Sequence, residues 1–227
     1  MIEFVFLDLD DTILDFGWAE RRALTAELRS HGFEPDDAML RRYSEINVQH
    51  WQMLERGELT REQTLVRRFA VWLEELGLPF DPEVIQVGYE SRLGSGHCFI
   101  DGAPELLDAL VGRYRLFIAS NGCASVQAGR IESAGIARYF ERMFVSELMG
   151  ADKPSREYFE LCFSQIEGFD PSKAVIIGDS LTSDILGGLN TGMHTVWFDP
   201  NGRPSTDIVP EYTVRSLSEI PPLLEKM

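Results

Sequence analysis

Short apolar runs that each end at a polar residue recur along this 227-residue chain and restrict its fold more than any other feature. An uninterrupted apolar run of this length is typical of a strand that is covered on both faces, as in a parallel sheet. Helical stretches, such as residues 155–165 and 182–189, lie between the later runs. We therefore expect an α/β fold with a doubly wound, Rossmann-like parallel sheet. The five runs are Phe4–Leu7, Leu116–Ala119, Met143–Val145, Ala174–Ile177 and Thr195–Phe198.

Residues 16–96 show a second pattern, in which large apolar side chains recur at helical spacing and no strand is indicated. Asp36 and Thr60 are expected to begin helices, and Gly57 and Gly77 to end them. We predict a helical domain over residues 16–96, with its aromatic side chains in the core of a bundle. This domain would be inserted into an α/β core formed by residues 1–15 and 97–227.

The net charge of the chain limits the classes of molecule that it can bind. The 37 acidic and 21 basic residues give a formal net charge of −16. Such a surface disfavours nucleic acid polymers, whose binding depends on neutralised phosphates, and also anionic membranes. The sequence shows neither a run of about 18 apolar residues, as a membrane span needs, nor a signal peptide. We expect a cytoplasmic protein, a monomer or homodimer, whose substrate is a small-molecule phosphate ester.

Ligands of open parallel sheets bind outside the carboxyl ends of the strands. This rule gathers into one crevice the polar residues that end the apolar runs, together with a lysine in the loop after the third run. The chain has only three lysines, so a lysine in this position is notable. The residues expected in the crevice are Asp8, Asp10, Ser120, Asn121, Lys153, Asp179 and Asp184.

The chemistry of these residues indicates a magnesium site. Several carboxylates in a partly buried crevice cannot all ionise without compensation, because like charges raise one another's pKa. Carboxylates with little histidine or thiolate nearby favour Mg²⁺ over zinc. Lys153 and Ser120 would add a positive charge and a hydroxyl donor. Together these groups supply the nucleophile, charge neutralisation and proton donor that phosphoryl transfer needs.

Four segments of the chain resemble, in order, the motifs of the haloacid dehalogenase-like (HAD) superfamily. They are DLDDT at 8–12, the apolar run that ends at Ser120, Lys153-Pro154, and GDSLTSD at 178–184. The resemblance extends from residue 3 to about residue 200, with the helical block in the position of that family's cap domain. It implies a magnesium-dependent phosphatase. One departure is Asp11, where the family often has glycine; an aspartate there can cap the loop through its side chain.

The resemblance implies catalytic roles for the motif residues. Asp8 would be the nucleophile and would form an aspartyl-phosphate intermediate. Asp10 would protonate the leaving oxygen and then activate the water that hydrolyses this intermediate. Ser120, Asn121 and Lys153 would bind the phosphoryl group. For Ser120, the alternative is that its hydroxyl only caps a helix.

The resemblance also implies a ligand set for Mg²⁺. Asp8 and Asp179 would bind the ion through their carboxylates, and Asp10 through its backbone carbonyl. Asp184 would orient the site without binding directly. The alternative for Asp184 is that it only places a charge at the start of a helix.

The predicted cap domain would set the specificity, because the core motifs contact only the phosphoryl group. Asn47, Trp51 and Arg68, with DLDDTILDF and GDSLTSDI, resemble the cytosolic pyrimidine 5′-nucleotidase subgroup. This implies deoxyuridine, thymidine and uridine monophosphates as substrates. Phe16, Trp18, Trp51 or Arg68 could supply the stacking surface and donors that a nucleobase needs. The alternative is that these residues only form the core and surface of the helical domain.

Other functions stay open at this point. A sugar-phosphate or phosphoglycolate-type phosphatase is the main alternative. Asp10 argues against a true dehalogenase, and a phosphomutase would have to exclude water from the intermediate. A catalytically silent binding or scaffold protein is an alternative of another class. Such a protein should have lost at least one of Asp8, Asp10, Lys153 or Asp179, and all four are present.

Overall fold

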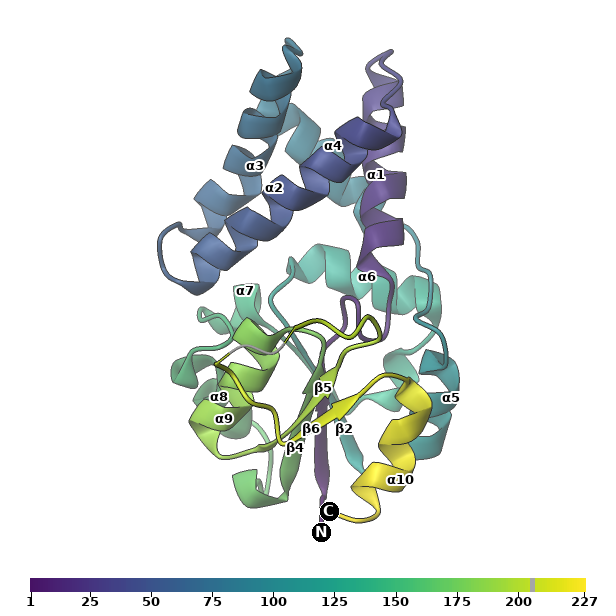
Figure 1. The fold of residues 1–227 in the computed structure, drawn as a ribbon, viewed down its shortest axis with the longest axis vertical. Coiled ribbons are helices and arrows are strands. Elements are labelled where there is room, and N and C mark those ends of the chain that lie inside the picture. Colours follow the sequence, from purple (N-terminus) through teal and green to yellow (C-terminus); the bar gives the residue numbers. More distant parts are fainter. Residues whose placement is uncertain (205–206) are drawn as a thin grey trace.

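The computed structural model describes residues 1–204 and 207–227, and its core is a six-stranded parallel sheet (Figure 1). The sheet order is β3-β2-β1-β4-β5-β6, and every neighbouring pair is parallel. All five predicted runs are strands, which confirms the α/β fold; the short sixth strand carries no such run. The strands are β1 (Phe4–Leu7), β2 (Arg115–Ser120), β3 (Arg142–Val145), β4 (Ala174–Gly178), β5 (His194–Phe198) and β6 (Tyr212–Val214).

Helices cover both faces of this sheet. In β1, Val5 and Leu7 belong to one apolar core, and Phe4 and Phe6 belong to another on the opposite face. Both faces are therefore apolar, which explains why the strands are uninterrupted apolar runs. The helices of this layer are α5 (Ala103–Leu110), α6 (Ala124–Ala134), α7 (Ser146–Met149), α8 (Arg156–Phe163), α9 (Leu186–Thr191) and α10 (Ile220–Leu224). Short 3₁₀ helices span Ala137–Tyr139, Pro171–Lys173 and Leu217–Glu219, and a π-helical turn spans Leu181–Ile185.

The order of the strands creates a crevice at one end of the sheet. From β1 the chain adds β2 and β3 on one side, and then crosses to place β4, β5 and β6 on the other. The carboxyl ends of β1, β2 and β4 therefore meet where the strand order reverses, which is where open parallel sheets bind ligands. This end of the sheet faces a separate block of helices, while both chain termini lie at the opposite end (Figure 1).

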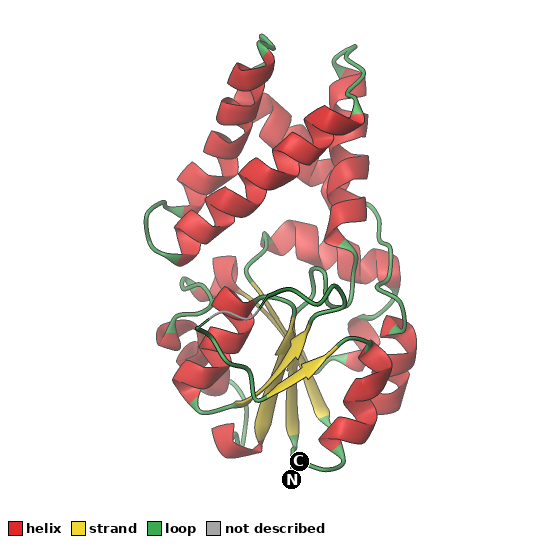
Figure 2. Cartoon of the chain, viewed as in Figure 1, coloured by secondary structure: helices red, strands yellow, loops and turns green. Residues whose placement is uncertain are grey.

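The helical block follows β1 and contains no strand (Figure 2). Asp36 and Thr60 are N-caps and Gly77 is a C-cap with a φ of 63°, as predicted. The predicted stop at Gly57 lies two residues beyond the helix end at Glu55. The division into domains at residues 15/16 and 96/97 stays a prediction. The helices are α1 (Phe16–Ser30), α2 (Asp37–Glu55), α3 (Arg61–Leu76) and α4 (Pro82–Leu93).

Aromatic side chains form the core of this helical block. Tyr43, Phe69, Trp72 and Tyr89 are completely buried, and the rings of Tyr43 and Phe69 lie 4.9 Å apart between centroids. Their burial confirms the predicted role of this aromatic pattern as bundle core. Among residues 1–204 and 207–227, no helix is both long enough and apolar enough to cross a membrane.

A carboxylic acid is also buried inside the helical block. Glu20 of α1 accepts hydrogen bonds from Ser44 and Asn47 of α2, the second over 2.7 Å from Nδ2 to Oε1. Burial raises the pKa of Glu20 to about 7, although these two hydrogen bonds lower it in part. The folded chain therefore holds this carboxyl in its neutral form at a pH at which the unfolded chain has already released the proton.

We expect Glu20→Gln to stabilise the protein at pH 8. The folded pKa of about 7 lies above the ordinary value of 4.5, so the stability that the neutral acid contributes is complete below pH 4.5 and is lost as the pH rises through 7. The gain at pH 8 should reach at most about 3 kcal/mol and disappear towards pH 4.5. Urea unfolding of both proteins across this range would measure it. Equal stability at pH 8 would show that Glu20 ionises without penalty.

Candidate active site

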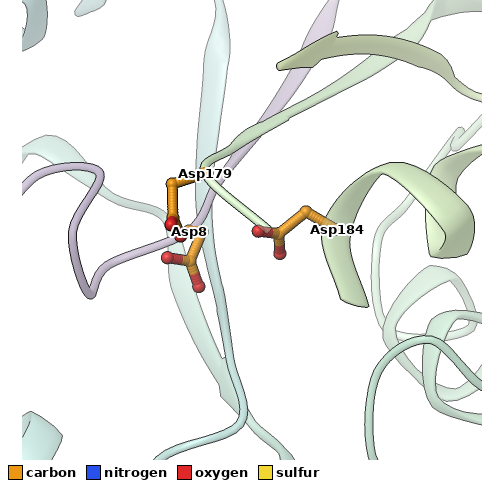
Figure 3. Close-up of side chains that lie close together, drawn as sticks. All are labelled: Asp8, Asp179 and Asp184. Carbon is orange, nitrogen blue, oxygen red and sulfur yellow. The ribbon is translucent and has the colours of Figure 1, made fainter. Parts of the chain in front are cut away.

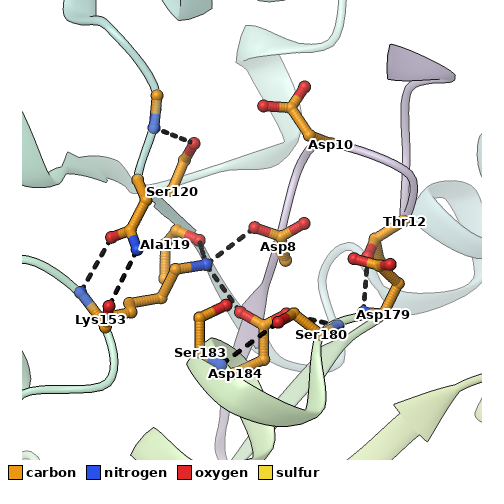
Figure 4. A network of polar contacts seen from close by, with 12 residues as sticks. Asp8, Asp10, Thr12, Ala119, Ser120, Lys153, Asp179, Ser180, Ser183 and Asp184 are labelled. Atoms are coloured by element: carbon orange, nitrogen blue, oxygen red, sulfur yellow. Dashed lines mark hydrogen bonds and ion pairs between the residues drawn. The ribbon is translucent and has the colours of Figure 1, made fainter. Parts of the chain in front are cut away.

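A buried lysine lies at the centre of the crevice. Lys153 Nζ donates to Asp8 Oδ1 at 2.8 Å, to Asp184 Oδ1 at 2.6 Å and to the carbonyl oxygen of Ala119 at 2.7 Å (Figure 4). Only 1% of Lys153 is exposed, so water screens these ion pairs weakly. Burial by itself would lower the pKa of Lys153, but Asp184 and Asp8 raise it above the ordinary value. Lys153 is therefore a fixed cation beside Asp8.

Three carboxylates meet around this lysine. Asp8, Asp179 and Asp184 each have an oxygen atom within 4.8 Å of the others (Figure 3). Burial raises the pKa of Asp8 well above its ordinary value, Lys153 opposes this shift, and the Asp184 charge adds to it. Burial and then Asp184 raise the pKa of Asp179 to about 7. Lys153 and Arg203, whose Nη1 lies 3.6 Å from Asp179 Oδ2, are two cations beside three carboxylates, so this cluster carries excess negative charge when all three are ionised.

The donor set of this cluster fits a magnesium ion. All three side chains offer carboxylate oxygens, which Mg²⁺ prefers, and a divalent cation would remove the excess negative charge. Asp184, predicted to support the site from outside, lies within the cluster itself. The carboxylate of Asp10 points elsewhere (Figure 4), which leaves the predicted backbone carbonyl as its route to an ion.

The loop after β4 brings two of these carboxylates together. The backbone N–H of Ser180 donates to Asp184 Oδ2 at 3.1 Å, and that of Asp179 donates to Thr12 Oγ1 at 3.1 Å. A Cβ atom at Gly178 would overlap the Asp184 carboxylate, so this close approach requires glycine. The glycine of the GDS segment therefore lets the Asp184 carboxylate pack against the end of β4.

One side chain of β5 and one that follows this strand also fix Asp179. Its carbonyl oxygen accepts hydrogen bonds from Trp197 Nε1 at 2.8 Å and from Arg203 Nη2 at 2.7 Å. Arg203 is held in turn by Asp199, whose Oδ1 lies 3.0 Å from its Nε. Arg203 was not predicted, because it follows the GDSLTSD motif by 19 positions and belongs to no motif. The signal available in the sequence was Asp199, the polar residue that directly follows the predicted strand Thr195–Phe198.

Asn121 and Ser120 follow β2. The Asn121 amide donates to the Lys153 carbonyl at 2.9 Å and accepts from the Lys153 N–H at 2.8 Å, so it holds the lysine's loop in place. Its predicted role in binding phosphate stays a prediction, for which the amide has a second N–H besides the one that bonds the Lys153 carbonyl. Ser120 Oγ accepts hydrogen bonds from Gly122 N–H at 3.1 Å and from Gln127 Nε2 at 2.8 Å. Its own hydroxyl proton remains available for a ligand.

Asp10 is bound by two residues of α6. Gln127 Nε2 donates to Asp10 Oδ2 at 2.6 Å, and Arg130 Nη1 forms an ion pair with Asp10 Oδ1. Neither residue was predicted from the sequence. Their spacing of three positions, on a helix that begins directly after the Ser120 motif, was the signal that places them on one face.

Asp11 adopts the backbone conformation that favours glycine, with a φ of 58°. Its Oδ1 accepts a hydrogen bond from the N–H of Phe16 at 2.9 Å. The prediction that this aspartate caps the loop is therefore confirmed. The loop carries the chain from the end of β1 into the first turn of α1.

A cavity of about 700 Å³ opens between this site and the helical block. Phe16, Trp51 and Arg68 line it, together with the motif residues at its base. Trp18, which was predicted with them, is not among the lining residues. Its side chain is 40% exposed and contacts Arg22, whose guanidinium lies 5.6 Å from the ring centre. Trp18 points away from the cavity because α1 turns that face outward.

Arg68 forms part of the cavity wall although it is only 3% exposed. Its Nη1 donates to Asn47 Oδ1 at 2.6 Å, and Asn47 in turn donates to Glu20. The guanidinium lies 5.9 Å from the centre of the Trp51 ring. A chain of polar contacts therefore fixes Arg68 beside an aromatic surface.

Arg61 and Glu55 of the helical block both contact the core. Arg61, in the first turn of α3, donates to the Asn121 carbonyl at 3.0 Å and forms an ion pair with Asp152. Glu55, at the end of α2, accepts a hydrogen bond from Thr182 Oγ1 at 2.8 Å. These contacts attach the helical block to the loops that carry Lys153 and Asp179.

Comparison with known proteins gives matches over nearly the whole chain. A family model described as haloacid dehalogenase-like hydrolase matches residues 2–192. YfnB of Bacillus subtilis, assigned as a HAD-hydrolase, is 37% identical over 95% of this chain and 92% of its own length. A crystal structure of YfnB bound to magnesium superimposes with a TM-score of 0.94 and 36% identity, over 98% of each chain.

Other relatives have names that state a substrate. Pyrimidine 5′-nucleotidase PynA of Streptococcus pneumoniae is 34% identical over 99% of this chain and 95% of its own. Pyrimidine 5′-nucleotidase YjjG of Escherichia coli is 30% identical over 99% and 98%. A glyceraldehyde 3-phosphate phosphatase of Pyrococcus abyssi is 30% identical over 87% and 82%. These similarities confirm the resemblance that the four motifs predicted.

Proposed function

Because this chain belongs to the haloacid dehalogenase-like hydrolases, we propose that it is a magnesium-dependent phosphatase that removes the 5′-phosphate from pyrimidine nucleoside monophosphates. The observation that carries the proposal is the buried Lys153 between Asp8 and Asp184, at the base of a cavity of about 700 Å³. A buried cation beside a carboxylate gives a phosphate ester both a nucleophile and charge neutralisation. The chain as a whole has a formal net charge of −16, so the positive charge that binds the phosphate must be supplied locally, and Lys153 supplies it.

Asp8 is the nucleophile in this proposal. Lys153 binds its Oδ1, which leaves Oδ2 to attack the phosphorus. As this bond forms, the bond from phosphorus to the 5′-oxygen breaks, and Asp10 gives that oxygen a proton. Water then attacks the aspartyl-phosphate, Asp10 accepts a proton from it, and inorganic phosphate leaves with Asp8 regenerated.

Asp8, Asp179 and Asp184 would hold Mg²⁺, with the Asp10 carbonyl as a further ligand. Bound Mg²⁺ supplies neutralising charge for the phosphoryl oxygens. The all-oxygen donor set supports this assignment, as does the magnesium in the YfnB crystal structure. Ser120 would donate its free hydroxyl proton to a second phosphoryl oxygen.

The cavity wall supports a nucleotide as the substrate. Trp51 and Phe16 offer aromatic surface for a base, and Arg68 offers N–H donors for its carbonyl oxygens. The contacts of Arg68 with Asn47 and Trp51 hold the guanidinium in one orientation before any ligand binds. The two relatives named pyrimidine 5′-nucleotidases add support from outside the structure.

A sugar-phosphate phosphatase is the second candidate, favoured by the glyceraldehyde 3-phosphate phosphatase among the relatives. The size of the cavity argues for the nucleotide. Small-molecule sites span roughly 300–1,000 Å³, and a three-carbon phosphate ester would leave most of this cavity empty. The aromatic wall would also have no partner on such a substrate.

A panel of phosphate esters tests the proposal. We expect phosphate release from uridine, deoxyuridine and thymidine monophosphates, with a kcat/KM at least about tenfold above that for glyceraldehyde 3-phosphate or phosphoglycolate. EDTA should stop the reaction and added Mg²⁺ should restore it. A preference for the sugar phosphates would exclude the nucleotidase and keep the phosphatase. No release from any ester would support a scaffold protein.

The net charge of the whole chain also bears on which partners it can bind. The formal net charge of −16 supports a small-molecule phosphate ester, and it argues against nucleic acid polymers and membranes as partners. The cytoplasmic location and the monomeric or homodimeric state stay predictions from the sequence.

A further inference from the structure

Two side chains of α6 hold the carboxylate of Asp10 from one side. Gln127 donates to Oδ2 at 2.6 Å, and Arg130 pairs with Oδ1. Gln127 also donates to Ser120 Oγ at 2.8 Å, and its Oε1 lies 3.4 Å from Arg130 Nη1. All four side chains line the cavity. Asp10 is thus fixed at both oxygens, and one amide connects it to Ser120.

The burial of Arg130 at this position reduces the stability of the fold. It is completely buried, and its Nε and Nη2 atoms have no hydrogen-bond partner in the described part of the chain. A buried donor without a partner costs about 1–3 kcal/mol, and more when the group is charged. An apolar side chain of similar volume would bring no unpaired N–H group into the interior, so these two unpaired donors are a cost to stability. What the guanidinium adds is the bond to Asp10.

The orientation of Arg130 is itself restricted. Its guanidinium lies 5.7 Å from the centre of the Phe16 ring, which stands in the first turn of α1. Gln127 and Arg130 lie three positions apart, so α6 presents both to the loop after β1. The carboxylate they hold is 28% exposed, on the cavity side. Asp10 therefore faces the space between the phosphoryl site and the helical block.

We propose that Gln127 and Arg130 are positioning residues that fix the Asp10 carboxylate where the leaving oxygen of the ester lies, with Gln127 linking that carboxylate to Ser120. This inference rests on the proposed function. The proton of Asp10 moves to the ester oxygen as the phosphorus–oxygen bond breaks. The resulting carboxylate is the form that Gln127 and Arg130 bind, and it is held ready to accept a proton from the attacking water.

The test compares two leaving groups. A nucleoside needs a proton as it leaves, whereas 4-nitrophenolate leaves without one. kcat/KM reports the steps through departure of the leaving group. In Arg130→Met we expect kcat/KM for uridine monophosphate to fall about 100-fold, and that for 4-nitrophenyl phosphate to fall less than about fivefold. Arg130→Lys should recover part of the loss, because it restores a charge near Asp10.

Two further variants keep the result interpretable. Arg138→Met removes an exposed arginine eight positions later in the sequence, outside the cavity lining, and should change neither value. If Arg130→Met does not fold, Gln127→Met, which keeps the volume, carries the same comparison. Equal losses on both substrates would overturn the inference and leave Gln127 and Arg130 as structural residues. A wild-type protein that hydrolyses neither ester would instead overturn the proposed function.

Discussion

Replacing Asp8 with asparagine should abolish phosphate release while the fold stays intact. An amide cannot form the aspartyl-phosphate, so we expect turnover of uridine monophosphate to fall by at least about 10⁴-fold. Burial raises the pKa of the Asp8 carboxyl, which means that its ionised form is disfavoured in the folded chain. The amide avoids this penalty, and Lys153 keeps its bond to Asp184. We therefore expect a melting temperature, measured without magnesium, at or above that of the wild type.

The matched control is Asp101→Asn, which changes an exposed aspartate outside the site. It should retain wild-type turnover and stability. Phosphate release should be followed over time, because slow deamidation of the new asparagine would restore Asp8 and produce activity that rises from zero. Steady activity above about 1% of wild type from the first minutes would mean that another group is the nucleophile.

The strands could be predicted because their signal is local. The runs in β1, β2 and β4 contribute side chains to the apolar cores on both faces of the sheet, so they are continuously apolar. β6 gives no such signal because it has three residues at the edge of the sheet, with Tyr212 half-buried and Thr213 exposed. The helix starts at Asp36 and Thr60 were also local, since each capping side chain bonds a backbone N–H three residues away.

The candidate site could be predicted as a set of residues but not as an arrangement of side chains. The strand-end rule places Asp8, Ser120 and Asp179 together. It does not give the direction of each side chain. Asp10 turns to Arg130, which is 120 positions away in the sequence, and Asn121 turns to the Lys153 backbone. Such directions depend on hydrogen bonds between distant segments, and one sequence carries no record of them.

Replacing Lys153 with methionine should have the largest effect on stability. The variant would leave Asp8 and Asp184 without the cation that pairs with both, and breaking a buried ion pair from one side costs about 3–5 kcal/mol. Turnover should fall by at least about 100-fold, because the phosphoryl group loses its fixed positive charge. Chemical unfolding at pH 8 and phosphate release would measure the two effects.

The stability loss should depend on pH and on magnesium. Lys153 opposes the upward pKa shifts of Asp8 and Asp179, so its removal raises both values further. A carboxyl whose pKa is raised on folding contributes stability at low pH and loses it as the pH rises through the folded value. The loss in the free energy of unfolding of Lys153→Met, relative to the wild type, should therefore be smaller at pH 5 than at pH 8.

At pH 8, Mg²⁺ should recover more stability in the Lys153→Met variant than in the wild type, because the ion would then replace the cation that Asp8 and Asp184 have lost. Lys173→Met is the control, since that lysine bonds Glu3 at the far end of β1 and is exposed. It should unfold like the wild type under all conditions. A Lys153→Met deficit that is equal at both pH values and indifferent to Mg²⁺ would mean that Lys153 fills space and does not balance charge. The cluster would then offer no electrostatic reason to bind a metal, and the assignment of Asp8, Asp179 and Asp184 as its ligands would have to be abandoned.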